Sequence, residues 1–146
     1  FAPLPPSEDP ADVAASVGYP VVVKPLSLSG SRGVIRADDP DELSSAVERI
    51  RRILADAGED PDGPLIVERY MPGPEVSVEG ILWNGELEVL ATFDKPDTPD
   101  GPYFEETIFV TPTHLDPDVR DDVHRVTAAA ASSIGLREGP IHAELR

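Results

Sequence analysis

Cysteine is absent from the 146-residue sequence, which excludes disulfides, thiolate nucleophiles and cysteine-ligated zinc or iron–sulfur sites within it. The sequence also lacks an apolar run of about 18 residues, so we expect no membrane-spanning helix. The opening FAPLPPSEDP has neither a charged start nor an apolar stretch, so it is not a signal peptide. It also lacks an initiating methionine, which suggests a piece of a longer chain. A reducing, cytoplasmic setting fits these absences.

Positive charge is scarce, because 12 Lys and Arg residues stand against 28 Asp and Glu residues and give a formal net charge of −16. Such a chain repels the phosphate backbones of DNA and RNA, so we expect no nucleic-acid partner. Most of the acids are expected to form a solvated surface, and some of them could hold a divalent cation. The few cations that lie inside motifs are therefore more informative than usual.

Three helices are predicted, each opened by an Asp-Pro pair and closed by a glycine, at residues 9–18, 39–58 and 116–135. Aspartate caps the first backbone N–H groups, proline fits the first turn, and glycine adopts the conformation that ends a helix. In the third helix, apolar residues at helical spacing are expected to face inward, namely Val119, Val123, Val126 and Ala130.

Strand-like runs lie between the helices, at residues 20–25, 33–37, 65–70, 75–82, 86–93, 106–111 and 139–146. Asn84-Gly85 predicts a two-residue hairpin turn, because both residues accept positive φ. Helices and hairpins mix without a regular strand–helix repeat, which favours the α+β class over a doubly wound sheet. The chain-breaking MPGP at 71–74 predicts a boundary between two lobes, residues 1–71 and 72–146.

A lysine precedes a loop rich in serine and glycine in KPLSLSGSRGV, residues 24–34. Neither G-x-x-x-x-G-K-[ST] nor G-x-G-x-x-G is present, so no standard phosphate-binding motif applies. At the end of a buried strand, Lys24 needs either a carboxylate partner or an anionic ligand. Backbone N–H groups, serine hydroxyls and Arg32 could approach phosphate oxygens here, but a flexible hairpin tip would look much the same. From these residues alone both interpretations stay open.

Two further sets of polar residues accompany strands. In VERYMPGPEVSVE, Glu68 ends one strand and Glu75 opens the next. Backbone groups left unpaired at the strand end could bind the edge of a base, and the carboxylate a few residues on could accept from ribose hydroxyls. The alternative is a solvated strand face. In GPIHAELR, His142, Glu144 and Arg146 project from one side of a short strand. A site explains this second set better than a solvated face does, with Glu144 suited to Mg²⁺ and Arg146 to a phosphate or carboxylate. The Pro- and Gly-rich stretch 94–106 predicts a long loop that is either functional or a plain surface excursion.

Taken in order, the chain gives VVVKP, SGSRGV, an amphipathic helix, VERYMPGPEVSVEG and GPIHAEL. This order resembles the ATP-grasp superfamily, most of all its carboxylate–amine ligase branch, which includes amino-acid ligases and has biotin-carboxylase-like relatives close by. The resemblance covers about residues 15–146. It implies an α+β ATP-grasp fold with antiparallel sheets and flanking helices in two lobes, which clamp ATP and are incomplete here at both ends.

The resemblance also implies roles for the matching positions. Lys24 resembles the lysine that contacts the α- and β-phosphates of ATP, Glu75 the acid that binds the ribose, and Glu144 the first magnesium-binding glutamate. The loop that closes over the phosphates corresponds to residues 27–34, with Ser29, Gly30, Ser31, Arg32 and Gly33. The adenine-recognising hinge corresponds to Glu68, Arg69, Tyr70 and Met71. The family's second metal-binding acid and its preceding domain have no counterpart, so we expect a fragment.

The resemblance thus implies an ATP-dependent ligase that uses ATP and Mg²⁺ and joins a small-molecule carboxylate to an amine or, alternatively, a thiol. The carboxylate attacks the γ-phosphate to give an acyl phosphate and ADP, and the acceptor then displaces phosphate. Arg146 is expected to neutralise charge in this step, and His142 with the 94–106 loop to help select the substrate. A homo-oligomer is expected from the family alone. Two alternatives are a non-catalytic nucleotide-binding module with a degenerate metal site, and an acidic domain whose glycine-rich loop is only a hairpin.

Overall fold

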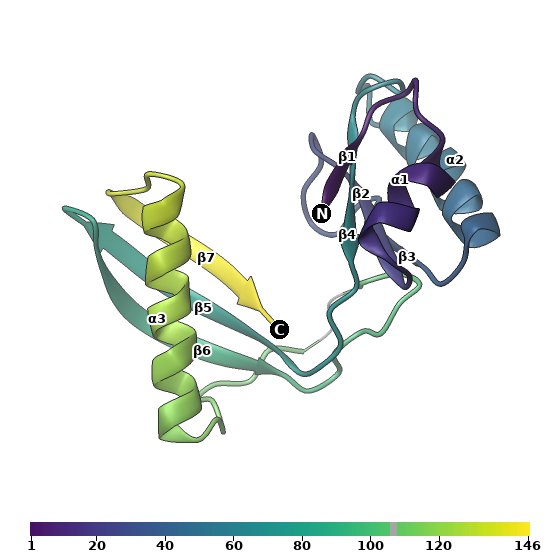
Figure 1. Cartoon of the computed structure of the whole chain (residues 1–146). Helices are drawn as coiled ribbons and strands as arrows, with labels where there is room; N and C mark the ends of the chain where they lie inside the picture. The colour runs from purple at the N-terminus through teal and green to yellow at the C-terminus, as the bar shows by residue number, and fades with distance from the viewer. Residues whose placement is uncertain (106–107) are drawn as a thin grey trace. The chain divides into compact units, whose positions relative to one another are not determined.

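The computed structural model describes residues 1–105 and 108–146, and within them it confirms the α+β class (Figure 1). The described residues form three helices and two antiparallel sheets. The chain divides into two compact units, Phe1–Met71 with Pro99–Glu105, and Pro72–Thr98 with Glu106–Arg146. The first unit thus includes the short segment Pro99–Glu105, which follows the first two strands of the second unit in the chain. None of the described helices has the length and apolar character needed to cross a membrane.

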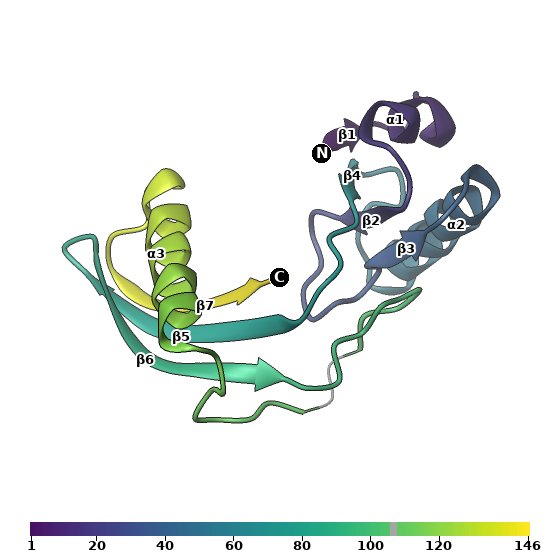
Figure 2. The same cartoon turned by 60° about the horizontal axis from the view of Figure 1, so that its bottom comes forward.

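The first unit is a four-stranded antiparallel sheet with two helices packed on one face (Figure 2). From edge to edge, the strands are β1 (Ala2–Leu4), β4 (Leu65–Arg69), β2 (Val21–Pro25) and β3 (Ile35–Ala37). The helices are α1 (Pro10–Val17) and α2 (Pro40–Asp56). Strand β1 was not predicted, because its three residues are too few to show an alternating pattern. Its pairing with β4, which places Ala2 opposite Val67, supplies what local sequence does not.

The caps and apolar spacing predicted for α2 account for its position. The Asp39 side chain accepts a hydrogen bond from the Glu42 N–H at 2.9 Å, which satisfies a donor that the helix itself leaves unpaired. One face of the helix is buried, through Leu43, Ala46, Val47, Ile50 and Leu54. Each large apolar side chain buried in this way contributes about 1.5–3 kcal/mol. This stripe packs against the buried residues of β2 and β4, so the opposite face of the sheet is left for polar side chains.

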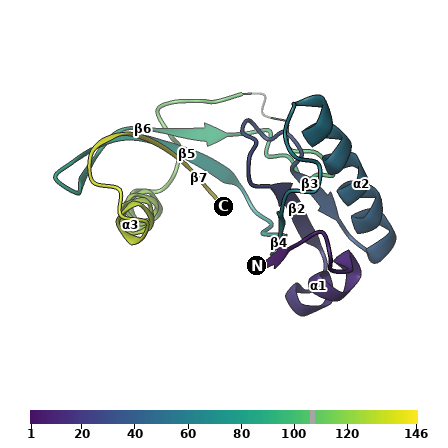
Figure 3. The ribbon, with the colours of Figure 1, turned by 90° about the horizontal axis from the view of Figure 1, so that it is seen from above.

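The second unit is a three-stranded antiparallel sheet with one helix against one of its faces (Figure 3). The strand order is β6 (Glu86–Lys95), β5 (Glu75–Trp83) and β7 (Gly139–Leu145), and the helix is α3 (Pro117–Ser133). The hairpin turn is confirmed, since Asn84 and Gly85 have φ of +54° and +87°. Beyond the turn, a β-bulge between Glu79 and Gly80 shifts the β5–β6 register by one residue.

The predicted inward face of α3 is wrong at three of its four positions, with only Val123 partly buried, although the helix itself is confirmed. Val119 and Val126 are 48% and 45% exposed, and Ala130 is exposed as well. Thr127 and Ala131 are buried instead. Thr127 can be buried because its hydroxyl donates to the Val123 carbonyl at 2.8 Å, so no polar group is left unsatisfied. The prediction ranked residues by apolarity and therefore overlooked a threonine that satisfies itself within the helix.

The predicted strand at 106–111 falls partly on residues 106–107, which lie outside the described residues. The remainder is wrong as a strand, because residues 108–111 form only an isolated antiparallel bridge, between Val110 and Asp94. The Asp94 carboxylate accepts from the Thr113 hydroxyl and from the His114 N–H and ring. Burial works to raise the pKa of Asp94, but these hydrogen bonds hold it below its usual range. Side-chain bonds thus hold this segment, and strand periodicity cannot report them.

Candidate functional site

In the first unit, Lys24 and Glu68 lie on the face of the sheet that the helices leave uncovered. Val21 and Val23 point into the core, so Lys24 between Val23 and the strand end points the other way. Its ammonium is 2.7 Å from a Glu68 carboxylate oxygen, and about a third of each side chain is exposed, at 36% and 34%. The carboxylate partner expected for Lys24 is thus another candidate site residue. An ammonium so exposed can exchange a carboxylate for a phosphate oxygen without losing its charge-assisted bond.

The glycine-rich loop joins two paired strands, because β2 and β3 form an antiparallel pair on either side of it. Gly30, Ser31 and Gly33 all have positive φ, of +63°, +56° and +77°. Arg32 is exposed, and its Nε donates to the Ser29 carbonyl at 3.4 Å. The loop is therefore a hairpin connection in topology, with exposed donors at its tip. The hairpin interpretation and the phosphate-covering interpretation do not exclude each other.

The predicted hinge spans the end of β4, with Glu68 and Arg69 inside the strand and Tyr70 and Met71 after it. The side chain of Tyr70 already has partners. Its hydroxyl lies 2.9 Å from a carboxylate oxygen of Asp100, and the Arg36 guanidinium lies 4.3 Å from its ring centroid. Its backbone N–H donates to the Pro20 carbonyl at 3.0 Å. Arg69 and Met71 are exposed. Tyr70 therefore ties residues 99–105 to the sheet of the first unit, a role that the sequence did not indicate.

In the second unit, the face of the sheet that α3 does not cover carries a set of charged side chains. The α3 side is identified by the contact between His124 Nε2 and Thr92 Oγ1 at 2.8 Å. Strand alternation and the cross-strand register place the charged residues on the other face, namely Glu75, Glu79, Lys95, His142, Glu144 and Arg146. His142 and Glu144 on β7, and Arg146 directly after it, thus lie on the same face as Glu75 on β5.

Lys95, which sequence reasoning missed, lies at the centre of this set. Its ammonium is 2.5 Å from a Glu75 oxygen and also bonds a Glu144 oxygen. Arg146 Nε donates to the other Glu75 oxygen at 2.7 Å. Burial works to raise the pKa of Glu75, but the hydrogen bonds and charges of Lys95 and Arg146 outweigh it and hold that pKa below its ordinary value. Two cations therefore keep a largely buried carboxylate ionised.

His142 lies beside two carboxylates on the same face. Its Nδ1 is 2.6 Å from Glu79, and its Nε2 is 3.6 Å from Glu144. The hydrogen bond to Glu79, reinforced by both nearby charges, raises the pKa of His142 above its ordinary value. The ring can therefore carry a proton near neutral pH, which suits it to hold an anionic group or to pass a proton.

The surroundings of Glu144 give one observation against a metal site and one in favour of it. Among residues 1–105 and 108–146, no group of three or more His, Asp or Glu side chains is arranged to hold a metal ion. Mg²⁺ is nonetheless often bound through one or two carboxylates together with substrate phosphates, rather than in an all-protein cage. Glu144 supplies a carboxylate of this kind, 38% exposed and bonded here to the ammonium of Lys95. The donor chemistry fits a magnesium ion shared with a phosphate ligand.

Residues 17–146, nearly the whole chain, match the ATP-grasp domain family. The chain belongs to the ATP-grasp family. The ATP-grasp fold predicted from the ordered motifs is confirmed, both by this match and by solved structures of the same fold. The relatives include carboxylate–amine ligases, as the resemblance implied.

Three relatives show how far the similarity extends. An alanine–anticapsin ligase of Bacillus subtilis is 26% identical over 155 residues, which cover 95% of this chain and 32% of the relative. The crystal structure of an L-amino acid ligase from Bacillus licheniformis is 31% identical with a TM-score of 0.71, covering 91% of this chain and 30% of that one. A biotin carboxylase–β,γ-ATP complex from Campylobacter jejuni is 25% identical with a TM-score of 0.72, covering 92% and 29%. The chain spans about a third of the length of these relatives.

Proposed function

We propose that this chain is the ATP-binding core of an ATP-dependent ligase that joins a small-molecule carboxylate to an amine through an acyl phosphate. The observation that carries the proposal is that three cations are paired with carboxylates at the candidate positions. In a chain of net charge −16, Lys24, Lys95 and Arg146 each lie against a carboxylate of the candidate set, at 2.7 Å, 2.5 Å and 2.7 Å. Within each unit, a cation paired with a carboxylate in this way can exchange that partner for a phosphate or carboxylate oxygen of a ligand. The ligase names of the B. subtilis and B. licheniformis relatives support the reaction class.

The roles follow from the chemistry of each group. Lys24 and the donors of the 27–34 loop hold the phosphates of ATP, and Glu75 accepts from the ribose hydroxyls. Magnesium, when bound through Glu144 and the phosphates, neutralises charge on the transferred group. Lys95 and Arg146 hold the substrate carboxylate and the charge that develops as it reacts, because charge-assisted bonds to planar oxyanions are the strongest available.

The reaction proceeds in two balanced steps. A carboxylate oxygen bonds to the γ-phosphorus as the bond to the β–γ bridging oxygen breaks, which gives an acyl phosphate and ADP. The amine nitrogen then bonds to the acyl carbon, phosphate leaves with the C–O electron pair, and the nitrogen loses a proton. His142, whose pKa is raised by the hydrogen bond to Glu79, steadies the anionic substrate when protonated, and its neutral form receives that proton.

A titration of the chain with ATP, with and without Mg²⁺, tests nucleotide binding directly. Lys24→Ala is expected to weaken binding, because it removes a cation from the phosphates. Arg120→Gln, an exposed arginine on α3 whose partner is Asp121, is the matched control and is expected to leave binding unchanged. Equal affinity in the chain, the Lys24 variant and the control would contradict the assignment of Lys24.

A trapping experiment on the full-length protein tests the ligase chemistry separately, because this chain spans only about a third of the length of the ligases it resembles. With ATP, Mg²⁺ and a mixture of amino acids, hydroxylamine intercepts an acyl phosphate as a hydroxamate, and ADP is formed in equal amount. Glu144→Gln is expected to abolish both products while the protein remains folded. ATP binding without ADP or hydroxamate would favour the second candidate, a non-catalytic nucleotide-binding module. The observation that favours that candidate is that no described group of three acids and histidines is arranged around a metal position. Assembly as a homo-oligomer stays a prediction.

A further inference from the structure

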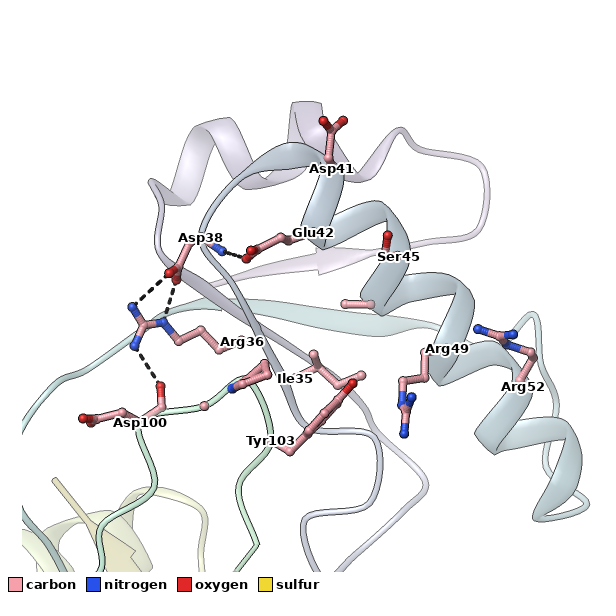
Figure 4. Close-up of a pocket in the computed structure, with 13 residues that line it drawn as sticks. Ile35, Arg36, Asp38, Asp41, Glu42, Ser45, Arg49, Arg52, Asp100 and Tyr103 are labelled. Atoms are coloured by element: carbon pink, nitrogen blue, oxygen red, sulfur yellow. Dashed lines mark hydrogen bonds and ion pairs between the residues drawn. The ribbon is translucent and has the colours of Figure 1, made fainter.

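The first unit contains a cavity of about 710 Å³ that the nucleotide proposal does not use (Figure 4). It lies at the β3 edge of the sheet, where residues 100–103 run beside that strand. The Arg36 N–H donates to the Pro102 carbonyl at 2.9 Å, and Ile35 bridges Tyr103. α2 forms the other wall. The volume is within the range of about 300–1,000 Å³ that is typical of small-molecule sites. None of the residues assigned above to ATP lines it.

The acidic side chains at one end of this cavity have structural roles. Asp38 accepts from Arg36 through both carboxylate oxygens, at 2.6 Å and 3.3 Å. Arg36 in turn donates to the Asp100 carbonyl at 2.8 Å. Glu42 accepts from the Asp38 N–H at 2.8 Å, and with Asp41 it lies in the first turn of α2, where negative charge complements the helix dipole. These charges are accounted for by the fold itself.

Two arginines at the other end of the cavity, Arg49 and Arg52, have no such structural role among the described residues. Within the described part of the chain, neither Arg49 nor Arg52 has a hydrogen-bonded or ionic partner, and both are exposed. Arg49 extends from α2 toward Tyr103, with its guanidinium carbon 4.8 Å from the ring centroid (Figure 4). Residues three apart on a helix are neighbours on its surface, so both guanidiniums can reach one group. Contact with the ring face orients the Arg49 guanidinium. It does not use the N–H donors, which remain able to bind the oxygens of a ligand.

We propose that this cavity binds a small organic anion, whose carboxylate or phosphate group is held by Arg49 and Arg52. Guanidinium groups present paired N–H donors that match the oxygens of either group. The body of the ligand lies on the Tyr103 ring, which is 47% exposed, and on the apolar floor that Ile35 and Ala46 provide. The site shares no residue with those assigned to the nucleotide, so it supplies a second ligand position.

Chemical-shift mapping on the intact chain tests the proposal with three probes: benzoate, inorganic phosphate and benzylamine. Benzoate is expected to shift the backbone amide signals of residues 45–52 and of Asp100, Gly101 and Tyr103 saturably. Benzylamine has the same ring and the opposite charge, and it is expected to leave them unchanged. A response to phosphate as strong as that to benzoate indicates a phosphate ligand, whereas a stronger response to benzoate indicates a carboxylate on an apolar body.

Substitutions then assign the shifts to the arginines. Arg49→Gln combined with Arg52→Gln is expected to weaken benzoate binding about tenfold or more, since each charge-assisted bond is stronger than a neutral one. Arg120→Gln with Arg125→Gln removes the same charge from α3 and is the matched control. Tyr103→Leu is expected to weaken benzoate more than phosphate, and it gives a second readout if the double arginine variant does not fold.

Lys24→Ala separates this proposal from the nucleotide proposal. It is expected to weaken ATP binding and to leave the benzoate shifts intact. The cavity proposal is overturned if benzoate gives no saturable shift in these residues, if benzylamine gives the same shifts, or if binding survives loss of both arginines. None of these outcomes bears on ATP binding, so either proposal can fail alone.

Discussion

The ammonium of Lys95 lies 2.5 Å from a carboxylate oxygen of Glu75, directly across the β5–β6 ladder. The two side chains are 5% and 14% exposed, so this is a largely buried ion pair. Taking two charges out of water is costly, and only their close contact and further hydrogen bonds offset that cost. Glu75 therefore depends on Lys95, together with Arg146, to remain charged inside the sheet face.

Replacing Lys95 by methionine is expected to lower the free energy of unfolding by about 3 kcal/mol at pH 7, because it leaves Glu75 charged with one cation fewer. Arg146 still contacts Glu75, which keeps the loss at the low end of the usual range. Urea denaturation measures it. Lys24→Met is the control: its pair with Glu68 is about one-third exposed, so the expected loss is about 0–1 kcal/mol. Equal losses in the two variants would contradict the difference in burial.

The same pair predicts a pH dependence. The pKa of Glu75 is held below its ordinary value in the folded chain, so its contribution to stability is present above that ordinary value, about 4.3. The contribution is lost as the pH falls through the lowered pKa. In the methionine variant Glu75 protonates more readily. The stability gap between the two proteins is therefore expected to shrink as the pH falls below about 4. A gap that stays constant from pH 7 to pH 3 would contradict it.

His142 gives a pH dependence of the opposite sign. Its pKa is raised by the hydrogen bond to Glu79, so the interaction is fully present below the ordinary value of about 6.5 and is lost as the pH rises through the raised pKa. Glu79→Gln is expected to bring the pKa of His142 down toward the ordinary value. Proton NMR titration of the ring signals measures both proteins. A titration midpoint for His142 that does not move on substitution would contradict the role of Glu79 in raising its pKa.

Glu75 was predicted from the sequence as a site residue, but its partner Lys95 was not. The reason is that the pairing of β5 with β6 is shifted by one residue from the pairing that the turn predicts. A two-residue turn at Asn84-Gly85 predicts that Glu75 lies opposite Asp94, because paired residue numbers then sum to a constant. The bulge between Glu79 and Gly80 shifts the pairing, so Lys95 lies opposite Glu75 instead. An isolated glycine in a strand often marks a bulge, and Gly80 was that signal. A Cβ there would lie 2.9 Å from the Glu88 carbonyl oxygen.

Other features depend on contacts that no local pattern encodes. The starts of α1 and α2 were predictable because Asp9 and Asp39 each cap a backbone N–H within one turn. Asp116 begins α3 without such a side-chain bond, so that helix start rests on the Asp-Pro pattern alone. The cavity beside β3 was not, because it needs residues 100–103 to pair with Arg36, which is more than sixty positions earlier in the chain. The same holds for Tyr70, whose sequence context suggested a ligand hinge and whose side chain binds Asp100. Ligand roles for the candidate residues stay predictions, since fold and family do not fix them.

Ser77 offers a test of the sheet face between Glu75 and Glu79. It is fully buried, and its hydroxyl has no hydrogen-bond partner among the described residues. An unsatisfied buried hydroxyl costs about 1–3 kcal/mol, so Ser77→Ala is expected to leave stability unchanged or raise it by up to about 1 kcal/mol. Thermal unfolding of the chain measures the change. A loss of more than about 1 kcal/mol would mean that the hydroxyl has a partner in solution.

The glycine-rich loop contains two glycines that separate backbone strain from crowding. Gly30 and Gly33 both have positive φ, of +63° and +77°. A Cβ at Gly30 would meet nothing within 4 Å, whereas one at Gly33 would lie 3.2 Å from the ring carbons of Pro25. Gly30→Ala is therefore expected to cost about 1 kcal/mol, from the left-handed backbone alone. Gly33→Ala is expected to cost about 2–3 kcal/mol, because a rigid proline ring adds steric strain. Denaturant unfolding of both variants measures the difference, and equal costs would show that Pro25 moves aside and that the base of the loop is not fixed by this contact.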